Sequence, residues 1–121
     1  MSLKTAIENF NNIESNNSKK YLLLGDMLEL GKHSMKQHKL ISNIINKTKI
    51  YQVYVIGKHI KETFSGLKQN KKAKILNNKS DIFDLINNDI NNNDYLMIKG
   101  SNSTGLHKIT NNLKQRGSNA L

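Results

Sequence analysis

The sequence predicts a single α/β domain built on an open, mostly parallel sheet with helices on both faces. Two observations carry this prediction. Short apolar runs that end near a glycine are typical of strands buried on both faces of a parallel sheet. They alternate with stretches in which apolar residues recur every three or four positions, as they do on one face of a helix. The chain has 121 residues, which is the size of one domain.

Three apolar runs predict buried strands, and a fourth run is a weaker candidate. The three are YLLLG (21–25), QVYVIG (52–57) and YLMIK (95–99), and the weaker one is AKIL (73–76). None of the three strong runs alternates strictly between apolar and polar residues. We therefore expect them to be covered by helices on both sides.

Helical periodicity fills the segments between these runs. Helices are expected over 3–13, 34–47, 59–64, 80–90 and 104–115. Ser34 is expected to cap the second helix, and Ser80 or Asp81 the fourth. A doubly wound sheet usually opens on a strand, whereas this chain opens on a helix. Either the fold has a helical prefix, or the chain has been cut from a longer protein.

Composition and charge exclude some classes of protein. There is no cysteine, which excludes a disulfide framework and thiolate chemistry. No signal-peptide core or membrane-length apolar run occurs, so we expect a cytoplasmic protein with no membrane partner. The net charge of +10 would suit a nucleic-acid partner. Because lysine is spread along the chain and forms no single stripe, a basic nucleic-acid-binding module is kept only as an alternative.

Three loops follow the carboxyl ends of predicted strands, where ligands bind in open α/β sheets. They are GDMLELGKHS (25–34), GKHIKE (57–62) and KGSNSTGLHK (99–108). Neither the P-loop pattern nor G-x-G-x-x-G occurs in the chain. The chain therefore carries no recognisable motif for nucleotide phosphates.

Asp26 and Glu29 are the carboxylates of the first loop, and they could be metal ligands or general bases. Two carboxylates without a histidine or cysteine beside them make a weak metal site. We favour a role in which Asp26 organises the turn and Glu29 meets a neighbouring amide. His38 falls among apolar positions and is expected to be buried and hydrogen-bonded. We therefore predict no catalytic residue and no metal site in this chain.

The run LLLGDMLELGKHSMKQH (22–38) closely resembles a signature of the Mur ligase family. It resembles most the members that add D-alanyl-D-alanine to UDP-N-acetylmuramoyl-tripeptide, at the start of their C-terminal domain core. The matching residues are Leu24, Gly25, Asp26, Met27, Glu29, Leu30, Gly31, Ser34 and His38. SLKTAIENF, QVYVIGKHI and DYLMIKGSNSTGLHKI are similar to further family segments in the same order. The resemblance thus covers essentially the whole chain.

The resemblance implies that residues 1–121 are a Rossmann-like C-terminal lid domain. The family's central ATPase domain and N-terminal UDP-binding domain are absent from this sequence. The family's lid opens with a strand and a Y-N-A-N-P-like segment, which would lie upstream of Leu3. We therefore expect a domain that is truncated at its N-terminus and lacks its first strand.

The family's chemistry implies a peptidoglycan-precursor ligase that uses ATP and Mg²⁺. ATP would convert the tripeptide carboxylate to an acyl phosphate, which the amine of D-alanyl-D-alanine then attacks. The expected partners are UDP-N-acetylmuramoyl-tripeptide and D-alanyl-D-alanine, and we expect a monomer. The isolated chain should bind neither ATP nor Mg²⁺ and should be inactive, because it has no P-loop.

The resemblance also assigns roles to residues. The turn after the last strand contacts the incoming amino compound in related ligases, which implies substrate binding by Lys99, Gly100, Ser101 and Asn102. The residues expected to shape the loop and cleft are Gly25, Asp26, Glu29, Gly31, Ser34 and His38. The nearest alternative is the lid of another amide ligase of the superfamily, such as a folylpolyglutamate enzyme, whose loop reads differently from GDMLELG.

Overall fold

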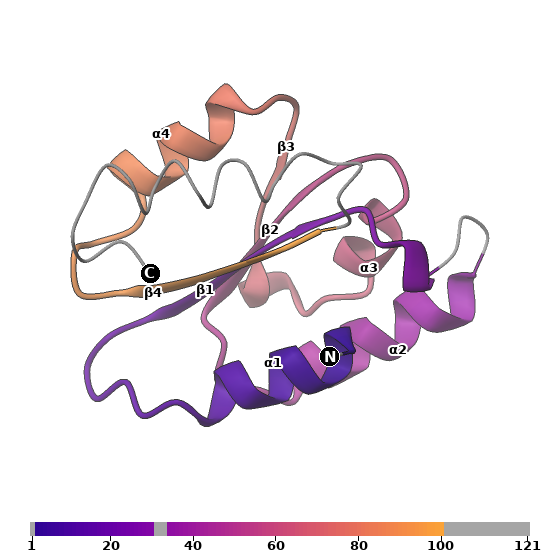
Figure 1. Cartoon of the computed structure of the whole chain (residues 1–121), viewed down its shortest axis with the longest axis horizontal. Coiled ribbons are helices and arrows are strands. Elements are labelled where there is room, and N and C mark those ends of the chain that lie inside the picture. Colours follow the sequence, from indigo (N-terminus) through magenta and orange to yellow (C-terminus); the bar gives the residue numbers. More distant parts are fainter. Residues whose placement is uncertain (1, 31–33, 101–121) are drawn as a thin grey trace.

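A computed structural model of the chain describes residues 2–30 and 34–100, and it is built around four parallel strands (Figure 1). These are β1 (Lys20–Gly25), β2 (Gln52–Ile56), β3 (Lys72–Leu76) and β4 (Tyr95–Lys99). They lie in the order β3-β2-β1-β4, and every neighbouring pair is parallel. The prediction of an open, parallel α/β sheet is confirmed, and the weaker strand candidate is one of its edges.

Helices alternate with these strands as the periodicity predicts. They are α1 (Leu3–Asn12), α2 (Met35–Asn46), α3 (Lys61–Ser65) and α4 (Ser80–Asn88), with short 3-10 turns at η1 (Leu28–Leu30) and η2 (Gln69–Lys71). Their ends differ by two residues or fewer from the predicted ranges. The helix predicted over 104–115 lies outside the described residues.

One of the two predicted caps is confirmed and the other is wrong. Ser34 caps α2, since its Oγ accepts a hydrogen bond from the N–H of Gln37 at 3.3 Å. Ser80 and Asp81 instead lie inside the first turn of α4. The Oδ1 of Asn78 takes the capping role, because it accepts the N–H of Asp81 at 3.2 Å. Asparagine caps helices as well as serine does, so residue type alone could not choose among these neighbours.

The direction in which the chain adds strands to the sheet reverses between β1 and β4, and we call this place the reversal point. The chain passes from β1 to β2 and β3 in one direction and then crosses back to the far side of β1. A right-handed crossover puts its helix on the opposite face of the sheet when the direction reverses. Accordingly, α1 and α2 cover one face and α4 the other, which confirms helices on both faces (Figure 1).

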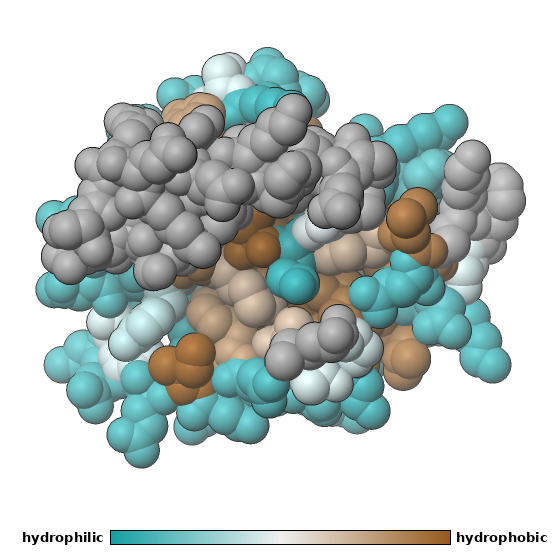
Figure 2. All heavy atoms as spheres, viewed as in Figure 1, coloured by the Kyte–Doolittle hydropathy of each residue, from teal (hydrophilic) through white to brown (hydrophobic). Residues whose placement is uncertain are grey.

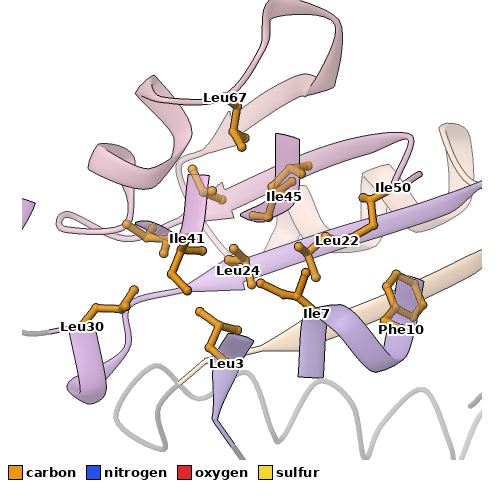
Figure 3. Packing of buried hydrophobic residues seen from close by; sticks show 13 residues of the cluster. Leu3, Ile7, Phe10, Leu22, Leu24, Leu30, Ile41, Ile45, Ile50 and Leu67 are labelled. Atoms are coloured by element: carbon orange, nitrogen blue, oxygen red, sulfur yellow. The ribbon is translucent and has the colours of Figure 1, made fainter. Parts of the chain in front are cut away.

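Alternate residues of β1 point into two separate hydrophobic clusters. Leu22 and Leu24 pack against α1 and α2, whereas Tyr21 and Leu23 pack against α4. Figure 3 shows the larger cluster, in which α1 contributes Leu3, Ile7 and Phe10, and α2 contributes Ile41 and Ile45. Burial on both faces explains why β1 reads as a continuous apolar run.

Two buried lysines close the amino edge of the sheet. The ammonium group of Lys20 donates to the carbonyls of Asn11, at 2.7 Å, and Ile13, just past α1. That of Lys71 donates to the carbonyls of Thr48, at 2.9 Å, and Ile50, at 2.6 Å. Both lysines therefore supply donors and positive charge near the carboxyl ends of helices, where carbonyls lack partners. Burial lowers the pKa of the Lys71 ammonium.

We expect Ile45→Ala to lower the free energy of unfolding by roughly 2–5 kcal/mol, because it leaves a cavity under α2. Leu40→Ala is the matched control on the same helix, since Leu40 is 49% exposed, and its effect should stay within about 0.5 kcal/mol. Urea unfolding followed by circular dichroism measures both. Equal losses in the two variants would contradict the placement of α2.

Candidate functional site at the carboxyl edge

The carboxyl ends of β2, β1 and β4 lie at one edge of the sheet (Figure 1). Gly25 at the end of β1 pairs with Ile56 of β2, and Leu24 pairs with Lys99 of β4. Neighbouring strands lie about 4.8 Å apart, so the residues that directly follow β1 and β2 start close together. In an open α/β sheet the crevice beside the reversal point, here between β1 and β4, is the usual place for a ligand.

The carboxylate of Asp26 joins the loop after β1 to the loop after β2. Its Oδ1 accepts the backbone N–H groups of His59, at 2.9 Å, and Ile60, at 2.8 Å. Its Oδ2 accepts the N–H of Lys58 at 3.1 Å. Successive backbone N–H groups that converge on one point form an anion-binding concavity, and here the anion is a side chain of the protein.

Gly57 is the residue that allows this approach. Its φ of +132° is a conformation that residues with a side chain rarely adopt. A Cβ built on Gly57 would also lie 2.7 Å from the Cγ of Asp26, which is closer than real contacts. Gly57 therefore adopts the backbone conformation that the turn needs and also leaves room for the Asp26 carboxylate.

Glu29 makes a comparable bond to a different helix. Its Oε2 accepts the N–H of Leu3 at 3.2 Å, at the first residue of α1. The Oγ of Ser2 caps the same helix by accepting the N–H of Thr5 at 3.2 Å. A carboxylate is favourable near the amino end of a helix, although the exposure of Glu29 makes the effect modest. Each carboxylate of the loop thus bonds to the amino-terminal region of a separate helix.

His38 is buried between α2 and α3, with an exposed fraction of only 2%. Its Nδ1 lies 2.8 Å from the Oγ1 of Thr63, and the Oγ of Ser42 lies 2.5 Å from the carbonyl oxygen of Thr63. Gly66 permits this packing, because a Cβ there would meet the Oγ of Ser42 at 2.6 Å. Among the described residues, the Nε2 of His38 has no hydrogen-bond partner. The ring therefore joins two helices rather than facing an open site.

Two of the residues predicted to contact substrate, Lys99 and Gly100, lie at the end of β4. Lys99 is the last residue of that strand, and both Lys99 and Gly100 are half-buried. Ser101, Asn102 and Gly31 lie outside the described residues. The substrate roles of the four residues from 99 to 102 stay predictions.

The edge offers no metal centre within the part of the chain that is described. No group of three or more histidine, cysteine, aspartate or glutamate side chains is close enough there to hold an ion. Both oxygens of Asp26 already accept backbone N–H groups. Sequence reasoning expected Asp26 to bond to the backbone of its own turn, and it missed that the partners lie in the loop after β2. It also missed the second role of Gly57, although a glycine directly after β2 was a usable signal.

Comparison with known proteins identifies several relatives, and three of them share one name. No family model matches the chain. Three relatives are named UDP-N-acetylmuramoyl-tripeptide–D-alanyl-D-alanine ligase. The protein of Buchnera aphidicola (subspecies Baizongia pistaciae) is 37% identical over 79 residues, covering 55% of this chain and 17% of that protein.

The other two relatives match more of the chain. The Rickettsia prowazekii protein is 28% identical over 108 residues, covering 89% of this chain and 24% of that protein. The protein of Buchnera aphidicola (subspecies Acyrthosiphon pisum) is 31% identical over 96 residues, covering 78% of this chain and 20% of that protein. The chain therefore spans about a fifth of the length of its relatives. These relatives confirm the resemblance to the Mur ligase family.

No helix of the described residues is both long enough and apolar enough to cross a membrane.

Asp26→Asn should lower the free energy of unfolding by about 2 kcal/mol, because it removes a charged acceptor shared by three backbone N–H groups. Asp84→Asn is the control, since Asp84 is an exposed carboxylate on α4, and it should change stability by no more than about 0.5 kcal/mol. Chemical unfolding of the three proteins makes the comparison. A negligible loss for Asp26→Asn would show that the amides do not depend on this carboxylate.

Gly57→Ala should destabilise the wild-type protein by about 1–3 kcal/mol, through backbone strain and the collision with Asp26. The same change should cost less when Asp26 is already alanine, because only the backbone strain remains. A double-mutant cycle measures this coupling directly. Strictly additive effects would contradict the close approach of the two residues.

Proposed function

We propose that the chain is the C-terminal lid domain of an ATP-dependent ligase that joins D-alanyl-D-alanine to UDP-N-acetylmuramoyl-tripeptide. The observation that carries this proposal is the position of the GDMLELG loop beside the reversal point of the sheet, in a chain similar to three ligases of that name. Because the chain spans about a fifth of those relatives, the reaction belongs to a longer protein. This chain would supply one wall of its active site.

In the proposed reaction, ATP phosphorylates the terminal carboxylate of the tripeptide. The amine of D-alanyl-D-alanine attacks the acyl phosphate, and the tetrahedral intermediate collapses to an amide with release of phosphate. The barrier to such a reaction falls mainly through positioning and through stabilisation of spread negative charge. A lid that closes over the site also keeps water from the acyl phosphate.

The end of β4 is the part of this chain that we assign to D-alanyl-D-alanine. Lys99 and Gly100 lie beside Gly25 at the reversal point, where they bring positive charge and backbone groups together. A dipeptide carboxylate needs such partners. Lys99 would hold that carboxylate and so orient the amine at the other end of the dipeptide toward the acyl phosphate.

The described residues of the carboxyl edge do not fit a bound Mg²⁺ ion or the phosphates of ATP. The carboxylates of Asp26 and Glu29 already accept backbone N–H groups, and the chain has no P-loop. In this proposal ATP and Mg²⁺ are therefore held by a part of the protein beyond this chain.

The role of Asp26 is to fix the loops of the carboxyl edge, so that the lid closes as a rigid surface. The proposed ligase uses ATP and a UDP-linked substrate, and this would place the full-length enzyme in the cytoplasm.

The test is a ligation assay on the complete polypeptide encoded by the reading frame that contains this chain. We expect formation of the UDP-N-acetylmuramoyl-pentapeptide, detected by mass spectrometry, and ADP release that depends on both substrates. Lys99→Ala should raise the KM for D-alanyl-D-alanine by roughly tenfold, which is the effect of losing one charge-assisted hydrogen bond. Lys39→Ala, an exposed lysine of α2, should leave the KM unchanged.

Two outcomes would contradict this proposal. One is the absence of product when D-alanyl-D-alanine is supplied together with ATP and Mg²⁺. The other is equal activity with an unrelated amino acid, which would favour a different amide ligase. The 121-residue chain assayed alone should release no ADP.

A further inference from the structure

The amino edge of the sheet carries a pocket at the opposite ends of the strands from the proposed ligase site. Its volume is about 520 Å³, and it lies between the loop after α1 and the starts of β1 and β2. Lys19 and Lys20 line it from one side, and Lys49 and Tyr51 from the other. Figure 1 shows that this loop and the carboxyl edge lie at opposite sides of the molecule. The surface around the loop is largely hydrophilic (Figure 2).

Lys20 makes one wall of this pocket rigid. It is only 5% exposed, and its ammonium group bonds to the carbonyls of Asn11 and Ile13 at the end of α1. The Oδ1 of Asn11 also accepts the N–H of Lys49 at 2.8 Å. These bonds join the end of α1 to the segment before β2, so the pocket is preformed rather than assembled by a ligand.

Lys19 and Lys49 supply positive charge that no carboxylate of the described residues neutralises. Among the described residues, neither ammonium group pairs with a carboxylate. Asp94 is the nearest acid to the backbone of Lys19, but its carboxylate accepts the N–H groups of Lys19 and Asn91, both at 3.0 Å. Of the described residues that line the pocket, Glu14 alone is acidic, against three lysines. The pocket therefore favours an anion.

Tyr51 adds a flat aromatic surface beside these charges. It is 43% exposed, and its ring stands edge-on to Tyr21 with centroids 5.6 Å apart. The ammonium group of Lys19 lies 4.3 Å from the centroid of the Tyr51 ring. A partly exposed ring held in place next to lysines is what proteins use to stack a nucleobase while binding its phosphates.

A neighbouring pocket lacks the excess of positive charge that lines the pocket at the amino edge. That pocket is about 350 Å³ and lies along Tyr54, with Lys74 and Asp89 at its wall. Tyr54 donates its hydroxyl hydrogen to the Oδ2 of Asp89 at 2.8 Å, and burial followed by this bond raises the pKa of Tyr54. One lysine there faces one aspartate, so no net charge is left for an anion.

We propose that the pocket between Lys19, Lys49 and Tyr51 binds a nucleoside phosphate unit, with the base against the ring and the phosphates on the two lysines. The unit could come from a free nucleotide or from a single strand of RNA, since both present the same chemistry. The pocket volume falls within the rough range of 300–1,000 Å³ that small-molecule sites have. This inference does not rest on the proposed ligase function, which concerns the opposite edge.

The experiment is an amide NMR titration of the chain with ADP, with inorganic pyrophosphate and with a short oligouridylate. We expect saturable shifts confined to residues 11–20 and 49–52 with ADP and with the oligouridylate. Lys19→Ala and Lys49→Ala should each weaken binding by roughly tenfold, the effect of losing one charge-assisted contact. Tyr51→Leu should weaken the binding of ADP and leave that of pyrophosphate unchanged.

Lys39→Ala removes the same charge from the exposed face of α2 and is the control, which should bind like the wild type. Tighter binding of the oligouridylate than of ADP would identify an RNA strand as the source, and the reverse would identify a free nucleotide. The proposal is overturned if neither probe gives saturable shifts at these residues, or if Lys39→Ala weakens binding as much as Lys49→Ala. It is equally overturned if pyrophosphate binds as tightly as ADP.

Discussion

The carboxylate of Asp26 is the interaction on which the architecture of the carboxyl edge depends. It joins the end of β1 to the loop after β2 through three backbone N–H groups, which have no other hydrogen-bond partner among the described residues. The bond requires Gly57, because any side chain there would collide with the carboxylate. A charged group that satisfies three amides costs much more to remove than one that faces water. The end of β1 and the loop after β2 are therefore held together by contacts within this chain.

Charged side chains at the two edges of the sheet follow one electrostatic rule. Helix amino ends, which are partly positive, gather at the carboxyl edge, where Asp26 and Glu29 bond to backbone amides. Helix carboxyl ends gather at the amino edge, where Lys20 and Lys71 bond to backbone carbonyls. Charges used in this way hold the fold together. Those left over, such as Lys99 and Lys49, are the ones available to a ligand.

The sequence predicted the layers of this fold better than it predicted the contacts of its loops. Apolar runs and helical periodicity located the four strands because burial on both faces leaves a local pattern, as in β1. The partners of Asp26 lie 32 to 34 residues further along the chain, and no local pattern records that distance. His38 was expected to be buried, but its partner Thr63 depends on how α3 packs against α2. The prediction of the residue that caps α4 was wrong because several residue types that commonly cap helices lie close together in that part of the sequence.

Hydrogen exchange at the backbone amides of Lys58, His59 and Ile60 tests the central role of Asp26 most directly. In the wild-type protein these three amides should be protected, since each donates to the carboxylate. In Asp26→Asn they should exchange faster by at least tenfold, while the amides of β1 keep their protection. Unchanged protection of the three amides in the variant would contradict the account, because another interaction would then be holding the loop.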